Sequence, residues 1–301
     1  MSTSLNHWFL ASRPKTLPAA AVPVLIGGAV AGANTTFKVL PWLICLAFAL
    51  LIQIATNYAN DYYDFKKGAD GKDRIGPKRA VASGWISPEA MFRGMLIVFA
   101  IAFFLGCSLI HWGGWWLLLI GVLSIVCGVA YTGGPYPLGY NGWGDVFVFI
   151  FFGWIATAFT YYVQAGTFLT PAFGIGSHWI WLAGMVPGAL ATNLLAVNNV
   201  RDEPQDRTTG KRTLVVRFGR NFGLLEYRAM SLVAILVPLW FAGTAGSTGC
   251  YLILLAAPLA LVCNRKLVTA SGRADYEKVL VLTALQLLVA GILFTVGLIL
   301  S

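Results

Sequence analysis

The sequence predicts an all-α fold, a polytopic membrane protein whose nine transmembrane helices form one bundle. The first reason is composition: 58% of the 301 residues are hydrophobic, only 11% are charged, and the mean hydropathy is +0.73. A soluble domain is about 45–50% apolar and about 25% charged. These values exclude an ordinary soluble enzyme, a disordered protein and a free nucleic-acid-binding protein. Nucleic acid is therefore not an expected partner, despite the net charge of +9.

The second reason is the spacing of the apolar segments. A helix needs roughly 20 mostly apolar residues to cross a bilayer, and nine segments approach this length, the eighth being the shortest. In chain order they cover residues 16–33, 38–58, 93–110, 113–131, 145–165, 179–199, 222–243, 249–264 and 279–300. Because these segments follow one another along the whole chain, we expect a single integral-membrane domain over residues 1–301.

Positive charge is unevenly distributed between the two sides of the predicted membrane. With nine spans, 20 of the 21 Lys and Arg residues fall on the side of the N-terminus, and only Lys38 falls on the other. Because Lys and Arg concentrate in cytoplasmic loops, we expect a multi-pass protein of the plasma (inner) membrane with its N-terminus in the cytoplasm. All 12 carboxylates fall on this side too, so any polar site is expected at the cytoplasmic face.

Acidic residues gather at the ends of two predicted spans. Four follow the second span and three follow the sixth: Asp61, Asp64, Asp70, Asp73, Asp202, Glu203 and Asp206. Asparagines accompany both groups at helical spacing. The pairs that lie four residues apart are Asn57 with Asp61, Asn60 with Asp64, Asn198 with Asp202, and Asp202 with Asp206. Residues four apart share one face of a helix, so each group presents its polar side chains in one direction.

The two acidic groups predict a site for a metal and a phosphate rather than a pair of solvated loops. Carboxylates that converge at a membrane interface disfavour one another's charged form unless a cation lies between them. Oxygen ligands from Asp and Asn suit Mg²⁺, which binds through a few carboxylates together with waters and substrate phosphates. Lys and Arg interleave with both groups and favour an anionic ligand, such as a diphosphate bridged by the metal.

The apolar spans suit the other half of such a ligand, a long lipid tail. Tyrosines adjoin the acidic groups, namely Tyr58, Tyr62, Tyr63 and, at the end of the fourth span, Tyr131. If a diphosphate leaves an allylic carbon, aromatic faces attract the remaining cation, and a dry pocket shields it from water. Residues 131–145 are rich in glycine and proline and contain no Lys or Arg, so we expect an irregular loop that caps the cavity.

Several segments resemble a known family. The motifs NDYYD (60–64) and DEPQD (202–206), the latter followed by GKRTL (210–214), resemble the two aspartate-rich motifs of the UbiA superfamily of intramembrane prenyltransferases. Five matches are similar to the branch that prenylates 1,4-dihydroxy-2-naphthoate in menaquinone biosynthesis: SRPKTLP (12–18), NYANDYYD (57–64), DRIGP (73–77), YTGGPYPLGY (131–140), and Arg201-Asp202 together with GKRTLVVRFG (210–219). Five residues separate Asp64 from Asp70, where the superfamily more often has three, so Asp73 competes with Asp70 as the third acid of the first motif.

The resemblance implies a reaction and a set of site residues. The implied enzyme transfers a polyprenyl group from polyprenyl diphosphate to 1,4-dihydroxy-2-naphthoate, releases diphosphate and CO₂, and gives demethylmenaquinone. The implied cofactor is Mg²⁺, with Asp61, Asp64, Asp70, Asp202 and Asp206 as ligands, of which all but Asp70 are also implied catalytic residues. The implied substrate-binding residues are Asn57, Asn60, Asn198, Arg74, Arg79, Lys211, Arg212, Tyr131 and Arg13. Either Arg13 or Lys15 is expected to hold the carboxylate of the acceptor.

Three other functions stay open at this point. A UbiA-type enzyme could use another aromatic acceptor, such as 4-hydroxybenzoate. A secondary transporter is disfavoured because transporters carry ionisable groups near the middle of the membrane, and the predicted spans contain no such group in their centres. Another Mg²⁺-dependent membrane transferase would use a nucleotide-linked donor. The sequence gives neither the prenyl chain length nor the oligomeric state.

Overall fold

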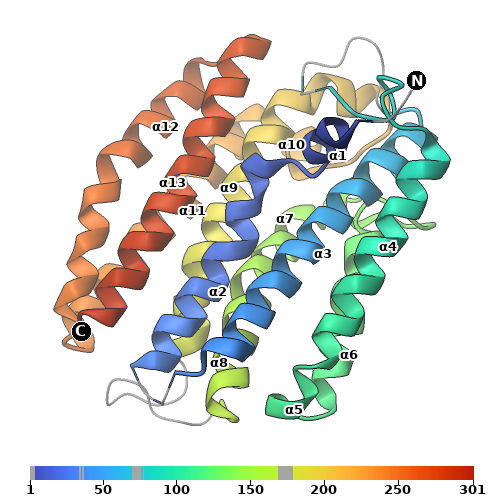
Figure 1. Cartoon of the computed structure of the whole chain (residues 1–301). Helices are drawn as coiled ribbons and strands as arrows, with labels where there is room; N and C mark the ends of the chain where they lie inside the picture. The colour runs from blue at the N-terminus through green and yellow to red at the C-terminus, as the bar shows by residue number, and fades with distance from the viewer. Residues whose placement is uncertain (1–3, 34, 36, 70–75, 77, 169–178) are drawn as a thin grey trace.

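The computed structural model describes residues 4–33, 35, 37–69, 76, 78–168 and 179–301, and every regular element within them is helical (Figure 1). Eight helical segments are long and apolar enough to cross a membrane, and a shorter apolar helix, α6, lies at the position of the fourth predicted span. The elements of the first half are α1 (Leu5–Ala11), η1 (Pro14–Thr16), α2 (Leu17–Gly32), α3 (Val39–Lys66), α4 (Pro88–Cys107), α5 (Ile110–Gly113), α6 (Trp116–Ala130), η2 (Leu138–Tyr140), α7 (Gly144–Phe149), η3 (Ile150–Ile155) and α8 (Ala156–Ala165). Those of the second half are α9 (Trp179–Thr208), α10 (Leu214–Phe218), α11 (Arg220–Thr244), η4 (Thr248–Ala256), α12 (Ala257–Thr269) and α13 (Arg273–Ile299). The predicted all-α fold is confirmed.

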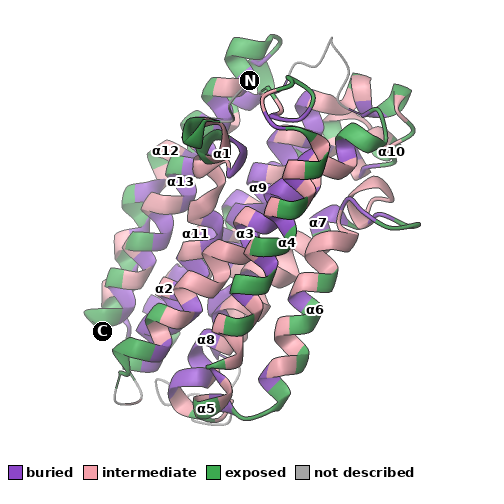
Figure 2. Cartoon of the chain, turned by 45° about the vertical axis from the view of Figure 1, so that its right-hand side comes forward, coloured by how far each residue is buried: buried purple, intermediate pink, exposed green. Residues whose placement is uncertain are grey.

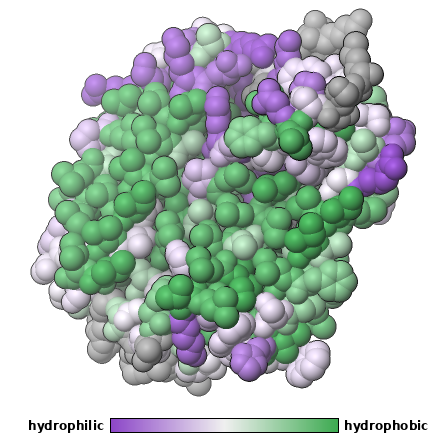
Figure 3. All heavy atoms as spheres, in the orientation of Figure 1, coloured by the Kyte–Doolittle hydropathy of each residue, from purple (hydrophilic) through white to green (hydrophobic). Residues whose placement is uncertain are grey.

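The surface identifies the protein as an integral, multi-pass membrane protein. On the face shown in Figure 3, hydrophobic side chains cover a broad band across the middle, and hydrophilic residues gather at the end where α1 and α10 lie (Figures 1 and 3). Large apolar side chains remain exposed along this band, including Phe104 on α4, Leu119 on α6 and Leu255 on η4. In lipid such exposure costs nothing, whereas in water a continuous apolar surface of this kind would drive association.

Helix α9 forms the centre of the bundle. It contacts α2, α7, η3, α8, α11 and α13, and 78% of its apolar stretch is buried. A helix that is apolar on every side is stable only inside a bundle, which explains why α9 lacks the exposed face of α4 and α6 (Figure 2). Because α9 is held on all sides, its polar C-terminal end is placed rigidly against the rest of the protein.

Helices α3 and α9 both continue beyond the ends predicted from hydrophobicity. The predicted spans stop at residues 58 and 199, whereas the helices end at Lys66 and Thr208. The additional two turns carry Asp61 and Asp64 on α3 and Asp202, Glu203 and Asp206 on α9, so these five acidic residues lie on helix rather than in loops. A helix C-terminus bears partial negative charge and favours cations. The carboxylates therefore stand where the backbone alone would disfavour them, and they require compensating positive charge.

The fifth span is interrupted by the π-helical segment η3, between α7 and α8. It approaches α9 through glycines: a Cβ added to Gly188 would lie 2.8 Å from the carbonyl oxygen of Phe149 and 3.0 Å from the Cα of Gly153. Backbone atoms cannot move aside as a flexible side chain can. These glycines therefore set the distance between the fifth span and α9, which line the same cavity described below.

The close approach at Gly188 predicts the effect of a single methyl group. Replacing Gly188 with Ala should force η3 and α9 apart and lower the stability by about 1–3 kcal/mol, as for other overpacked cores. Gly243→Ala on α11 is the matched control, because a Cβ there would have no neighbour within 4 Å. Thermal unfolding of the detergent-solubilised variants would measure both. A Gly188→Ala protein as stable as Gly243→Ala would contradict the role given to this contact.

Candidate functional site

A polar cavity of about 190 Å³ lies at the hydrophilic end of the bundle, where the last turns of α3 and α9 meet. Ten of the residues singled out from the sequence line this cavity: Arg13, Asn60, Asp61, Asp64, Arg79, Tyr131, Asn198, Asp202, Asp206 and Lys211. The two acidic motifs, which are far apart along the chain, thus face one space. The prediction that both motifs serve a single site agrees with this geometry.

Lys211 connects the two acidic groups directly. Its ammonium nitrogen lies 3.5 Å from Oδ1 of Asp64 on α3 and 3.8 Å from Oδ1 of Asp206 on α9. A second connection joins the same two helix ends, because the side-chain amide of Gln205 donates a hydrogen bond of 2.8 Å to the carbonyl of Ala69. Both Asp64 and Asp206 are buried, so their charges are poorly screened and the nearby cation matters.

Tyr140 of the 131–143 loop organises the basic residues around Asp64. Its hydroxyl donates a hydrogen bond of 2.7 Å to Oδ1 of Asp64. Two ammonium groups lie near its ring, that of Lys67 4.7 Å and that of Lys211 4.5 Å from the ring centre. Lys67 also donates to the carbonyl of Thr132 at 2.7 Å. Partial burial lowers the pKa of Lys67, a shift that the charge of Asp64 opposes and that of Lys211 reinforces.

Asp61 has a role in the structure that its motif did not reveal. Its two carboxylate oxygens accept hydrogen bonds from the backbone amides of Ala80 and Val81, at 3.0 and 3.1 Å. The side chain thereby fixes the loop that carries Arg79, whose guanidinium lies 3.4 Å from Asp64. Asp61 holds a cation-bearing loop in place, and its place among the metal ligands stays a prediction.

Asn57 holds the N-terminal segment against the cavity. Its side-chain amide donates to the carbonyl of Ser12 at 2.9 Å and to the hydroxyl of Thr16 at 3.2 Å. Between these two residues, Arg13 has φ +50°, the one positive φ of a non-glycine residue among those described. Such a backbone costs free energy and persists only where its surroundings impose it. The strained backbone places Arg13 at the cavity wall, whereas Lys15 is exposed.

The second acidic group contains an ion pair whose importance the sequence did not reveal. Arg201 is 3% exposed and makes two hydrogen bonds of 2.7 Å to Asp202. In this bidentate pair the two charges neutralise each other. In the first acidic group, the side-chain oxygen of Asn60 accepts a hydrogen bond of 2.8 Å from the hydroxyl of Thr132. Arg201 directly precedes Asp202, and this adjacency was the available signal, although neighbours on a helix do not ordinarily face each other.

The remaining predicted residues do not join the cavity. Asp70 and Arg74 lie outside the residues that the structure describes. The Arg212 side chain is exposed, while its backbone amide donates a hydrogen bond of 2.6 Å to the carbonyl of Tyr140. Arg212 therefore supports the 131–143 loop through its backbone.

The described residues supply oxygen ligands without a closed metal cage. Among them, no group of three or more His, Cys, Asp or Glu side chains lies close enough to hold a metal. Asp64 and Asp206 nevertheless approach one shared cation, the Lys211 ammonium. Two carboxylates at one point fit Mg²⁺, which often uses only one or two protein carboxylates and completes its shell with waters and substrate phosphates. The donor set thus fits this metal when a phosphate is present.

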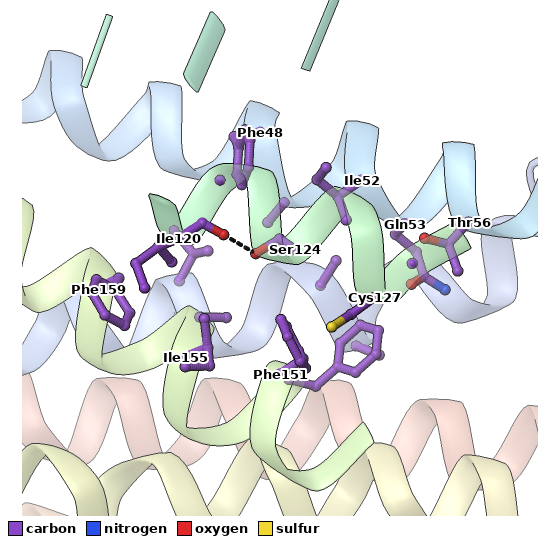
Figure 4. Close-up of a pocket in the computed structure, with 18 of the residues that line it drawn as sticks. Phe48, Ile52, Gln53, Thr56, Ile120, Ser124, Cys127, Phe151, Ile155 and Phe159 are labelled. Atoms are coloured by element: carbon purple, nitrogen blue, oxygen red, sulfur yellow. Dashed lines mark hydrogen bonds between the residues drawn. The ribbon is translucent and has the colours of Figure 1, made fainter. Parts of the chain in front are cut away.

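An apolar cavity of about 300 Å³ continues from the polar one into the membrane-spanning region. The two cavities share Asn60, Tyr131, Leu195 and Asn198 as wall residues. Beyond them the walls are mainly aliphatic and aromatic. Figure 4 shows the labelled side chains Phe48 and Ile52, and Phe151, Ile155 and Phe159, pointing into this space. A ligand with a charged head and an apolar tail fits the joined cavities.

Comparisons with known proteins agree with this geometry. The model of the UbiA prenyltransferase family matches residues 20–288. The 1,4-dihydroxy-2-naphthoate octaprenyltransferase of Escherichia coli (strain K12) is 37% identical to this chain over 302 residues, which covers 98% of this chain and 95% of that protein. The match extends over both acidic motifs and the loop between α6 and α7.

Solved structures share the fold at low sequence identity. The apo structure of a UbiA homologue from Aeropyrum pernix K1 has a TM-score of 0.69 and 15% identity, covering 92% of this chain and 96% of that one. A UbiA homologue from Archaeoglobus fulgidus bound to DMAPP and Mg²⁺ has a TM-score of 0.62 and 13% identity, covering 96% and 99%. The family model, the relative and the shared fold lead to one conclusion: this chain belongs to the UbiA prenyltransferase family.

Proposed function

We propose that this enzyme transfers a polyprenyl group from polyprenyl diphosphate to 1,4-dihydroxy-2-naphthoate, releasing diphosphate and CO₂ and forming demethylmenaquinol, the hydroquinone form of demethylmenaquinone. The structural observation that carries the proposal is the contact of Lys211 with Asp64 and Asp206, because it joins the two acidic motifs at one polar cavity above an apolar one. The relative that is 37% identical over 98% of the chain supports this choice of acceptor.

The donor diphosphate would lie in the polar cavity and its polyprenyl tail in the apolar cavity. Asp64 and Asp206 would hold Mg²⁺, with Asp61 and Asp202 on the same walls and Asp70 as a predicted further ligand. A bound Mg²⁺ supplies positive charge that stabilises the leaving diphosphate. Arg79 and Lys211 add cationic groups at the same place. Stabilisation of developing charge by fixed groups is usually the largest contribution to catalysis.

The bond changes follow from the junction between the two cavities. The allylic C–O bond of the donor breaks, and its electron pair stays on the diphosphate. The acceptor ring attacks the allylic carbon, and the ring carboxylate leaves as CO₂, which returns its bonding electrons to the ring. Tyr131 lies at the junction with its hydroxyl 3.0 Å from where a Cβ on Gly144 would stand. Its aromatic face would attract the allylic cation, and the apolar walls would exclude water.

The acceptor would approach from the N-terminal side of the polar cavity. Arg13 is the cation on that wall, and its guanidinium acts electrostatically on Asp61. A guanidinium matches a carboxylate in shape and charge, so Arg13 would bind the carboxylate of the naphthoate. The polar end of the bundle would face the cytoplasm of the plasma (inner) membrane, because nearly all Lys and Arg residues lie at that end.

The choice of acceptor is tested with the purified enzyme and a radiolabelled prenyl diphosphate. We expect label in the product with 1,4-dihydroxy-2-naphthoate, release of one CO₂ per prenyl transferred, and little product with 4-hydroxybenzoate. EDTA should abolish turnover, and excess MgCl₂ should restore it. Prenylation of 4-hydroxybenzoate in preference to the naphthoate would refute the proposed acceptor while leaving the donor site intact.

Asp64→Asn tests the metal and diphosphate site. The variant keeps the shape of the side chain and an acceptor for the Tyr140 hydroxyl but loses the charge, so we expect kcat to fall about 10²–10³-fold, as when other charge-stabilising groups are removed. Glu277→Gln is the matched control, since Glu277 forms only an exposed pair with Arg273. Gel filtration would establish that both variants are folded. A normal kcat for Asp64→Asn would show that Asp64 does not hold the metal or stabilise the diphosphate.

Arg13→Gln tests the acceptor subsite. Loss of a hydrogen bond to a charged group, about 1.5–3 kcal/mol, should raise the KM for the naphthoate about tenfold to hundredfold while the KM for the donor changes little. Lys15→Gln is the control, because Lys15 lies outside the cavity wall. If Lys15→Gln raised the KM for the naphthoate and Arg13→Gln did not, the acceptor carboxylate would have to be assigned to Lys15.

A further inference from the structure

Lys211 stands at a position set by the helix end next to it. Its backbone amide donates a hydrogen bond of 3.0 Å to the carbonyl of Asp206, and the following amide binds the carbonyl of Tyr140. These bonds fix the start of the side chain at the mouth of the polar cavity. Only 18% of the side chain is exposed, and its ammonium reaches Asp64 on the other helix. The chain is thus built to keep one cation between the two carboxylates.

That position is the one where a metal shared by the two acidic motifs would have to bind. Asp64 Oδ1 and Asp206 Oδ1 lie 3.5 and 3.8 Å from the nitrogen, which are contacts of an ion pair rather than of a metal bond. A divalent ion placed between the same oxygens would stand within a few ångströms of the ammonium, and like charges at that separation repel strongly where water is sparse. The ammonium and the metal therefore exclude each other.

We propose that Lys211 is a placeholder for the metal: its ammonium neutralises Asp64 and Asp206 until the metal and the diphosphate arrive together, and it then moves onto the diphosphate. This inference rests on the proposed function and adds an order to it. Metal alone must displace the ammonium without giving it another anion. Metal with diphosphate supplies that anion, so the two ligands bind cooperatively.

Tyr140 supplies a path for this movement. Its ring face holds the Lys211 ammonium 4.5 Å from the ring centre, and an aromatic face attracts a cation without the directionality of a carboxylate. The ammonium can therefore leave the carboxylates while staying against the ring. Lys67, whose ammonium lies 4.7 Å from the centre of the same ring, is a second cation at this place. When the Lys211 ammonium leaves the carboxylates, it and the Lys67 ammonium thus remain at the cavity, where both would bind the diphosphate.

The experiment measures Mn²⁺ binding to the purified enzyme by electron paramagnetic resonance, with and without inorganic pyrophosphate. Lys211→Met removes the ammonium while keeping an unbranched side chain. We expect Mn²⁺ alone to bind about tenfold more tightly to this variant, and the enhancement of Mn²⁺ binding by pyrophosphate to shrink by a similar factor, within the usual range of coupling between ligands. General damage to the fold would weaken both kinds of binding, so opposite changes are diagnostic.

Two further variants make the outcomes distinct. Lys66→Met removes an exposed positive charge from the same end of α3 and should leave Mn²⁺ binding nearly unchanged. Adding Asp64→Asn to Lys211→Met should abolish the gain in affinity. If Asp64→Asn as a single substitution leaves Mn²⁺ binding unchanged, the metal site of the proposed function is wrong. If Asp64→Asn weakens binding but Lys211→Met does not strengthen it, the placeholder role alone is wrong.

A stability measurement covers the case in which Lys211→Met folds poorly. Without the ammonium, Asp64 and Asp206 lose the cation that they share, and the variant should unfold at a lower temperature than the unaltered enzyme. Mn²⁺ binds the folded state and should restore stability, with a larger rise in unfolding temperature for Lys211→Met than for the unaltered enzyme. An equal rise in the two proteins would overturn the proposal.

Discussion

The ion contacts of Lys211 with Asp64 and Asp206 are the interaction on which the rest of the site depends. Carboxylates crowd the C-terminal turns of α3 and α9, where the helix backbone already carries partial negative charge, and both helix ends meet in a place with little water. Such an arrangement is stable only with cations inside it, and the protein supplies these from elements flanking the two helix ends, including Arg79 and Lys211. In the proposed function the same cations would bind the donor diphosphate. The groups that compensate the acids would thus also recognise the substrate.

The joined cavities divide the chemistry between two environments. Asn60, Tyr131, Leu195 and Asn198 belong to both walls, so the reacting carbon of a bound donor would lie where polar groups give way to aromatic and aliphatic ones. A cation formed there is shielded from water on one side and lies near fixed negative charge on the other. The glycine contact between η3 and α9 matters for this reason, because it sets the width of the apolar wall opposite α3.

Much of this was predictable from local patterns, and the remainder depends on contacts between distant segments. The lengths of the apolar segments located the spans to within a few residues. Helices α3 and α9 continue about two turns further, because a helix can continue through polar residues after the apolar segment used for the prediction has ended. The i,i+4 spacing correctly placed Asn60 with Asp64 and Asn198 with Asp202 on shared faces. It could not distinguish Asp61 from Asp64, since the difference lies in the amides of Ala80 and Val81, which come from another loop. The contacts of Arg201, Lys67 and Tyr140 could not be predicted for the same reason.

The contrast between Asp61 and Asp64 explains why the first motif needs two aspartates one helical turn apart. Both carboxylate oxygens of Asp61 accept hydrogen bonds from backbone amides, and charge-assisted hydrogen bonds of this kind hold a loop strongly. The loop that it holds delivers Arg79 to Asp64. Asp64 instead contacts the cationic side chains of Arg79 and Lys211 and the hydroxyl of Tyr140, contacts that a metal would replace in the proposed function. Asp61 therefore holds the loop that stabilises Asp64, and Asp64 is the carboxylate that would exchange partners in the proposed reaction. Two aspartates that look equivalent in the sequence thus have different partners in the structure, backbone amides for Asp61 and side chains for Asp64.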